Sequence, residues 1–382
     1  MKKNRVIVAG HICVDFTPPI TARSGGSGGG IEEFLTPGKL IHVGPAYINP
    51  GGVVANTGLT MRFLGSDVTL MGKVGCDPFG RIVQDFLKEH GGAEGLTSDP
   101  AADTSYTVVL APPGIDRVFL HNPGANDTFS ANDIDYDVCE SALLFHFGYP
   151  PLMRRMYLDG GAELSEIFRR VKERGCLTSL DMAAVDEASE AGRADWNAIL
   201  QKTLPYVDFF MPSVEEICFM LDRRKYHELR KRAAGGDATE VLSVSEDIIP
   251  LGTRLLEMGC KLALIKCGAA GLYCRTSGTE AFNGLRASSD LKFDDFDGKS
   301  IFERSFVPEK VLSGTGAGDA AIGAFLTALT MGYSLEWCLR LAAAEGACCV
   351  ASVDALSGLK TLEELETKIR GGWERRIIPN SD

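Results

Sequence analysis

Apolar runs of strand length alternate with helix-length amphipathic segments over most of the chain. A short, continuous apolar run is typical of a strand that is buried on both faces of a parallel sheet. The expected strands are 5–10, 68–71, 143–147, 177–181, 207–211 and 262–266. The expected helices are 53–64, 78–90, 158–174, 195–204 and 248–258, followed by 317–331, 335–352 and 362–369. This alternation predicts a three-layer α/β fold with a mostly parallel central sheet, in a single domain over 1–382.

Two β-rich stretches, about 12–50 and 100–125, do not follow this alternation. Within the second, the runs 104–110 and 117–121 flank a Pro/Gly turn, a pattern typical of a β-hairpin. We therefore expect a small β lid at one edge of the main sheet. The segment SGGSGGG (24–30) is expected to be a mobile loop tip.

Two later segments are harder to assign. Residues 222–245 are charged and poorly patterned, and we interpret them as a surface insertion whose role the sequence does not give. Residues 272–275 are expected to pair with a later strand across a polar, aspartate-rich loop at 288–300.

The chemistry of the chain centres on the glycine-rich segment 312–320, in which Asp319 follows three glycines and precedes an apolar run of helical length. The first N–H groups of a helix are unpaired and carry partial positive charge, and glycines let a phosphate approach them closely. A carboxylate beside such an anion site could act as a general base on a hydroxyl that attacks the phosphate. The alternative is an ordinary helix start in which Asp319 complements the helix dipole. This segment alone does not decide between the two.

Three other polar residues are candidates with equally plain structural alternatives. Asp15 follows the first strand and could hold a polar ligand or cap a turn. Asn56 lies in the first turns of a helix opened by two glycines, and could present its amide to a ligand or simply pack. Ser213 and Glu216 fit a capping box, so Glu216 has a structural explanation beside a metal-related one.

A rival interpretation is a dinucleotide fingerprint, because residues 316–321 also fit G-x-G-x-x-A. That motif requires a following strand that ends in an acidic residue, whereas here helices continue to the end of the chain. A dehydrogenase is therefore disfavoured.

The net charge of −12 argues against a nucleic-acid or anionic-membrane surface. No uncharged stretch reaches membrane-spanning length. The eleven cysteines are scattered, mostly within apolar runs and without a CxxC pair, which predicts reduced thiols and a cytoplasmic location.

Taken together, the glycine segments resemble the PfkB carbohydrate kinase family, also called ribokinase-like. Residues 51–56 (GGVVAN) are similar to its sugar-binding G-G-x-x-A-N, and residues 72–80 (GKVGCDPFG) to its G-x-x-G-x-D-x-x-G. Residues 316–319 match its C-terminal G-A-G-D, and 122–126 (NPGAN) resemble the G-A-N after its lid hairpin. The order and spacing of these motifs extend the resemblance over nearly the whole chain.

The resemblance implies a ribokinase-like fold and specific roles. Asp319 would be the base, and Gly316, Ala317 and Gly318 would supply N–H groups to the transferring phosphoryl group. The implied sugar contacts are Asp15, Gly51, Gly52 and Asn56. The implied ATP contacts are Lys266, Gly268, Gly271, Thr315, Ala343 and Ala347. Glu216 would organise Mg²⁺ indirectly, through water.

The chain departs from the family pattern in two places. Ser213 replaces the Asn of the N-x-x-E motif. Ser313 and Gly314 replace the Asp-Thr that helps form a monovalent-cation site, so a monovalent cation is a doubtful cofactor.

The resulting hypothesis is an ATP-dependent kinase that phosphorylates a hydroxyl of a small sugar, with Mg²⁺ as cofactor. A homodimer through the lid is possible in such a family. A nucleoside kinase of the adenosine or inosine type remains an alternative, as does a non-catalytic sugar or nucleotide sensor, which the Ser313-Gly314 departure motivates.

Overall fold

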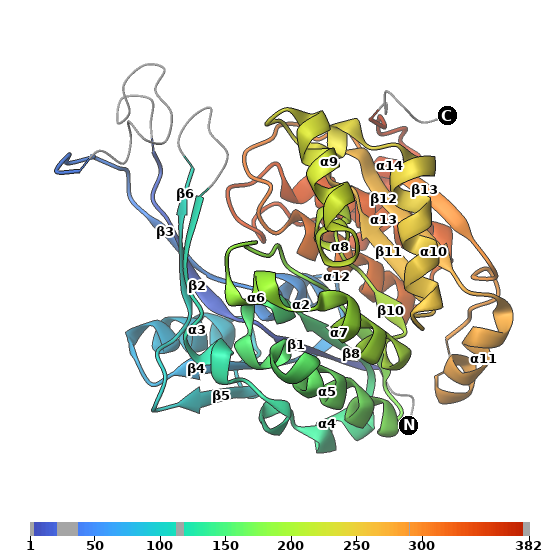
Figure 1. Cartoon of the computed structure of the whole chain (residues 1–382), viewed down its shortest axis with the longest axis horizontal. Helices are drawn as coiled ribbons and strands as arrows, with labels where there is room; N and C mark the ends of the chain where they lie inside the picture. Colours follow the sequence, from blue (N-terminus) through green and yellow to red (C-terminus); the bar gives the residue numbers. More distant parts are fainter. Residues whose placement is uncertain (1–3, 21–36, 112–117, 290, 377–382) are drawn as a thin grey trace.

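A nine-stranded sheet forms the centre of the computed structural model, which describes residues 4–20, 37–111, 118–289 and 291–376 (Figure 1). In spatial order its strands are β13 (Ser300–Arg304), β12 (Gly271–Thr276), β11 (Leu262–Lys266), β10 (Phe209–Phe210), β9 (Leu177–Leu180), β8 (Ala142–Gly148), β1 (Arg5–Gly10), β4 (Asp67–Gly75) and β5 (Leu96–Asp99). Every neighbouring pair from β11 to β5 is parallel, whereas β12 runs antiparallel to both β11 and β13. The mostly parallel sheet is therefore confirmed.

Helices cover both faces of this sheet, and each face has its own apolar cluster. One face packs against α2 (Val53–Phe63), α3 (Pro78–Glu89), α11 (Thr279–Ser288), α12 (Ala317–Thr330), α13 (Leu335–Cys349) and α14 (Leu362–Arg370). The other packs against α4 (Tyr136–Ser141), α5 (Ala162–Glu173), α7 (Trp196–Thr203), α8 (Val214–Leu221), α9 (Arg223–Ala233) and α10 (Ile249–Glu257). Across the described ranges, no helix is long and apolar enough to cross a membrane.

Strand β1 shows why the sheet needs two layers of helices. Val6 and Val8 belong to the first apolar cluster, while Ile7 and Ala9 belong to the second, so alternate side chains enter opposite layers. Because both faces are buried, the strand is apolar throughout, and this continuity made it recognisable in the sequence.

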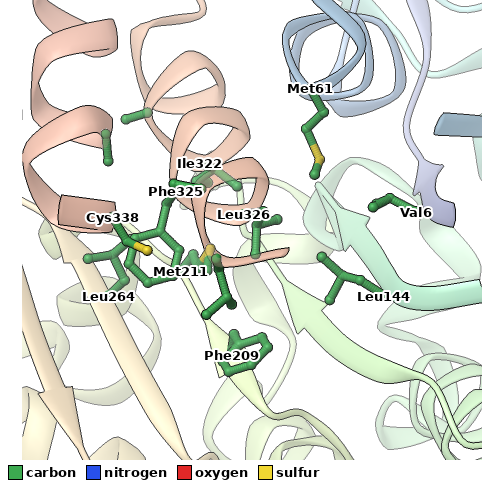
Figure 2. Packing of buried hydrophobic residues seen from close by; sticks show 14 of the residues in the cluster. Val6, Met61, Leu144, Phe209, Met211, Leu264, Ile322, Phe325, Leu326 and Cys338 are labelled. Carbon is green, nitrogen blue, oxygen red and sulfur yellow. The ribbon is translucent and has the colours of Figure 1, made fainter. Parts of the chain in front are cut away.

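Helix α12 is anchored over the middle of the sheet. Ile322, Phe325 and Leu326 of α12 pack toward Phe209 and Met211 at the end of β10 (Figure 2). All three helix residues are fully buried. This packing fixes the position of the N-terminus of α12, where Asp319 lies.

A second, four-stranded sheet extends away from the central sheet (Figure 1). Its order is β3 (Tyr47–Gly51), β2 (Cys13–Thr17), β6 (Tyr106–Leu110) and β7 (Val118–Asn122). Strands β6 and β7 form the expected antiparallel hairpin, and the small sheet fits the predicted lid. The turn at 112–117 and the glycine-rich segment 24–30 lie outside the described residues.

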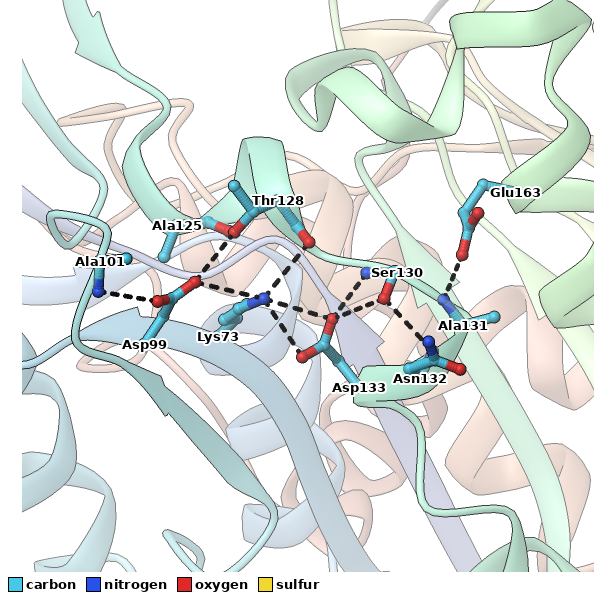
Figure 3. Close-up of polar contacts among 10 residues, drawn as sticks. All are labelled: Lys73, Asp99, Ala101, Ala125, Thr128, Ser130, Ala131, Asn132, Asp133 and Glu163. Atoms are coloured by element: carbon cyan, nitrogen blue, oxygen red, sulfur yellow. Dashed lines mark hydrogen bonds and ion pairs between the residues drawn. The ribbon is translucent and has the colours of Figure 1, made fainter.

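Lys73 on β4 ties the base of this second sheet to the central one. Its ammonium pairs with Asp99 at 3.4 Å and with Asp133 at 3.3 Å, and donates to the carbonyl of Thr128 (Figure 3). Thr128 ends the short helix (Gly124–Thr128) that follows β7. The chain that leaves the lid is therefore held against β4 and β5.

Two expected element bounds were wrong. Strand β4 continues to Gly75, past its expected end at residue 71. Helix α5 begins only at Ala162, because Gly160 and Gly161 have φ of 61° and 72° and interrupt the helix. The segment 222–245, interpreted as a surface insertion, contains a regular helix, α9. The expected pairing of 272–275 with a later strand is confirmed, because β12 pairs with β13, and helix α11 precedes the polar loop at 288–300.

Candidate active site

The carboxylate of Asp319 lies in the first turn of α12 and is held by three polar side chains. Its Oδ2 accepts hydrogen bonds from the Tyr149 hydroxyl at 2.7 Å and the Asn56 amide at 3.0 Å, and its Oδ1 accepts one from Thr57 at 3.2 Å. Asp319 is only 4% exposed. The side chain is thus buried among polar groups, which orient it, and is not turned into the apolar core.

Burial and hydrogen bonding act in opposite directions on this carboxyl group. Burial raises the pKa of Asp319, while the hydrogen bond from Tyr149, the charge of Lys266 and the contact with Asn56 lower it, and the net pKa is above its ordinary value. A raised pKa makes a carboxylate a stronger proton acceptor. The environment therefore suits a general base.

Gly316 starts α12 in a left-handed conformation, with φ of 79°. A Cβ at this position would lie 2.2 Å from the Cβ of Ala355, so both the backbone and the packing require glycine. The N–H groups at the start of a helix lack intrahelical acceptors and can bind an anion; here the N–H of Ala317 makes only a long contact, 3.4 Å, with the Gly314 carbonyl. The start of α12 next to Asp319 therefore has a backbone that could accept an anion.

Asp15 approaches this site from the second sheet. It lies on β2 and not simply past the end of β1, and its carboxylate occupies the space that a Cβ on Gly51 would need, at 2.1 Å. Burial raises the pKa of Asp15, and the charge of Asp319 raises it further, so the two carboxylates are within electrostatic reach. Gly52, with φ of 83°, begins α2, which carries Asn56.

On the opposite side, the ends of β9 and β11 bring together a buried ion pair. The Lys266 ammonium is 2.5 Å from Oδ1 of Asp181, the residue directly after β9. A Cβ on Gly318 would lie 3.7 Å from the same nitrogen, so the cation is adjacent to the start of α12. Burial alone would lower the pKa of Lys266, but the carboxylates of Asp181 and Glu216 outweigh it and hold the pKa above its usual value.

Glu216 forms the predicted capping box. Its Oε2 accepts from the backbone N–H of Ser213 at 2.6 Å, and Ser213 Oγ accepts from the N–H of Glu216 at 3.2 Å. Its charge nevertheless acts on Lys266, Asp181 and Tyr149, so it lies close to the site. The capping role is confirmed, and the metal-related role stays a prediction.

The remaining expected nucleotide contacts lie between β11 and β12, just before α12, and on α13. Gly268 and Gly271 have φ of 52° and 133°, and the crowding of a Cβ by Thr239 and by the Glu303 carbonyl requires glycine at each. Ala343 and Ala347 are buried in the apolar cluster on α13. The backbone N–H of Thr315 donates to Ser313 Oγ at 3.1 Å. Their contacts with a nucleotide stay predictions.

Sequence reasoning missed Tyr149, Thr57 and His11. Tyr149 directly follows β8, and its φ of 65° is unusual for a residue other than glycine. A usable signal was its place after the carboxyl end of a parallel strand, where ligands bind in α/β sheets. His11 follows β1 in the same way.

Known proteins resemble this chain over nearly its full length. A family model described as pfkB family carbohydrate kinase matches residues 29–362. A probable fructokinase-4 of Arabidopsis thaliana is 25% identical over 388 residues, covering 97% of this chain and 98% of the relative. A fructokinase-2 of Solanum lycopersicum is 24% identical, with 96% of each chain covered.

Solved structures show the same fold. A ribokinase from Thermotoga maritima superposes with a TM-score of 0.67 at 18% identity, covering 96% of this chain and 99% of that one. A fructokinase from Xylella fastidiosa with bound ATP gives a TM-score of 0.66 at 20% identity, covering 97% and 99%.

The fold is therefore that of the ribokinase-like kinases, with a buried carboxylate at the glycine-rich start of a helix. The chain belongs to the pfkB family of carbohydrate kinases. It is accordingly a phosphotransferase that acts on a hydroxyl group of a sugar, which confirms the carbohydrate-kinase expectation.

Proposed function

We propose that this enzyme transfers the γ-phosphoryl group of ATP to a hydroxyl of a small sugar, with Asp319 as general base. The observation that carries this proposal is the buried, raised-pKa carboxylate of Asp319 at the left-handed glycine start of α12. Asp319 takes the proton of the attacking hydroxyl, while the N–H groups around Gly316, Ala317 and Gly318 stabilise the charge on the transferring group. The sugar is bound by Asp15, Gly51, Gly52 and Asn56.

ATP as donor is supported by the related Xylella fructokinase with bound ATP and by an Arabidopsis thaliana ribokinase complexed with ribose and ATP. Lys266 is the cation best placed to reach the phosphates, because it adjoins Gly318. Asp181 orients the ammonium through their ion pair. The remaining nucleotide contacts in this proposal are Gly268, Gly271, Thr315, Ala343 and Ala347.

Mg²⁺ belongs to the proposal as a cofactor that would supply positive charge to neutralise the phosphates. Among the described residues, no group of three or more His, Cys, Asp or Glu side chains is arranged so that it could hold a metal ion. Glu216 fits the role of an indirect, water-mediated ligand, because its carboxylate lies near Lys266. Ser313 and Gly314 do not provide a side-chain carboxylate for a monovalent cation.

A homodimer through the lid is a further part of the proposal. The edge strands β3 and β7 expose apolar side chains: Tyr47, Ile48, Phe119 and Leu120. Covering them with a second lid would remove apolar surface from water. None of the eleven cysteines, all of which lie in the described ranges, forms a disulfide, which supports a cytoplasmic location.

The test is an ADP-release assay with Mg-ATP and a panel of ribose, fructose, glucose, adenosine and inosine. We expect sugar-dependent ADP release, with the phosphorylated sugar detected by mass spectrometry. Phosphorylation of the nucleosides alone would replace the sugar-kinase proposal with a nucleoside kinase. ADP release that is independent of every acceptor would overturn both.

A further inference from the structure

His11 is held rigidly by its backbone at the meeting point of three elements. Its N–H donates to the Gly148 carbonyl at the end of β8 at 3.3 Å, and its carbonyl accepts from Val54 in the first turn of α2 at 3.2 Å. The next residue, Ile12, exchanges two hydrogen bonds with the side chain of Asn126, at 3.2 and 2.9 Å. The backbone position of His11 is thereby fixed.

The imidazole of His11, in contrast, makes no hydrogen bond to any residue that the structure describes. Both ring nitrogens are buried and lack a hydrogen-bond partner in the described part of the chain, and the residue is 2% exposed. Leaving buried polar atoms unpaired costs stability, and such atoms in a folded protein call for an explanation. A ligand that hydrogen-bonds to the ring would provide one.

Two further rings lie next to His11, one on the lid and one beside the proposed base. The His11 ring lies 5.3 Å from the ring of His121 on β7 and 5.9 Å from that of Tyr149, measured between centroids. His121 Nδ1 contacts Thr107 Oγ1 at 3.0 Å, while its Nε2 is buried without a partner among the described residues. Tyr149 in turn donates to Asp319.

The charges around these rings select against an anionic ligand. Burial lowers the pKa of both His11 and His121, so both imidazoles are neutral near pH 7. A neutral imidazole offers one donor and one acceptor, which matches a hydroxyl group. Asp15 and Asp319, which act on each other electrostatically, would repel a carboxylate or phosphate on the substrate.

We propose that His11 and His121 are specificity-determining residues that hydrogen-bond the non-reacting hydroxyls of an uncharged cyclic polyol. This inference rests on the proposed function and names its substrate class. Sugar acids and sugar phosphates are excluded as good substrates, because their charge would face the two carboxylates. The aromatic faces of His11, His121 and Tyr149 would pack against the C–H face of the ring.

The first measurement compares neutral rings (fructose, ribose, glucose, myo-inositol) with gluconate and fructose 6-phosphate at saturating Mg-ATP. We expect kcat/KM for the best neutral ring to exceed that for either anion by about a hundredfold or more. A preference for either anion would overturn the inference. Turnover of no acceptor at all would overturn the proposed function as well.

The second measurement uses His121→Phe, which keeps an aromatic ring on a partly exposed lid strand and removes both nitrogens. We expect the KM for the sugar to rise about tenfold or more, and the KM for ATP to change less than about twofold. The same KM is then measured with analogues of the best sugar that each lack one hydroxyl. For the hydroxyl that binds His121, its removal should raise the KM in the wild type but not in the variant, as a double-mutant cycle requires.

The matched control is His90→Ala, at an exposed histidine that ends α3 and stacks on Phe86. It should leave both KM values unchanged. An unchanged sugar KM in His121→Phe, in an enzyme that phosphorylates the sugar normally, would overturn the inference and leave the proposed function standing.

Discussion

The phenolic hydroxyl of Tyr149 donates a hydrogen bond of 2.7 Å to Oδ2 of Asp319, although the two residues are 170 positions apart. Tyr149 reaches Asp319 from the end of β8 in a left-handed backbone conformation, with φ of 65° and ψ of 38°. For a residue other than glycine this conformation costs about 1–3 kcal/mol and is concentrated at functional sites. The strained backbone and the contact with the proposed base together indicate a positioning role for Tyr149.

Replacing Tyr149 by Phe should move the acid limb of the pH–rate profile to higher pH. The hydrogen bond from Tyr149 lowers the pKa of Asp319, so its loss lets burial raise that pKa further. The base acts only when deprotonated, so activity on the acidic side should fall. The measurement is kcat/KM against pH for wild type and variant. A limb that stays in place or moves to lower pH would show that Tyr149 does not tune Asp319.

Gly316→Ala should lose turnover and stability together. Alanine at φ of 79° is strained, by roughly 1–2 kcal/mol, and its Cβ would also meet Ala355 at 2.2 Å. The start of α12 must shift, and we expect kcat to fall at least about tenfold because transition-state contacts are sensitive to small displacements.

Gly332→Ala is the matched control for this prediction. Gly332 has φ of 85°, and nothing lies within 4 Å of the position of its Cβ. It should show the backbone cost alone, as a small drop in Tm with kcat retained. Equal losses of kcat in the two variants would contradict a specific role for the start of α12.

Lys266→Met should weaken ATP binding and destabilise the fold, because it leaves Asp181 buried without its partner. Breaking one side of a buried ion pair typically costs about 3–5 kcal/mol. The double variant Lys266→Met/Asp181→Asn should recover much of the stability, because it removes the unpaired charge, but should not recover the affinity for ATP. Thermal unfolding and the KM for ATP separate the two effects. Wild-type ATP affinity in the double variant would exclude Lys266 as a phosphate contact.

The layers of the fold could be predicted because buried parallel strands are apolar along their whole length, as in β1 and β8. Helix α9 could not be predicted, because its sequence is dominated by charge and buries only Leu229. It is held instead by ion pairs of Lys225 and Arg232 with Asp247, contacts between separate segments that periodicity does not reveal.

The site was only partly visible in the sequence, for a similar reason. The glycines could be recognised in the sequence, because Gly316 and Gly52 have backbone conformations that other residues rarely adopt. The motifs also brought Asn56 and Asp319 into one hypothesis, and their side chains are in contact. Tyr149 and His11 have no local pattern, because their roles depend on strand ends that meet only in the folded sheet.

Asp319→Asn tests the central claim most directly. The side chain keeps its size and the oxygen that can accept a hydrogen bond, but it can no longer take a proton from the substrate. We predict that kcat falls by about 10²–10⁴, as for the loss of a general base, with the Tm and the KM for ATP close to wild type. Sugar phosphorylation at the wild-type rate by a folded Asp319→Asn enzyme would contradict the account.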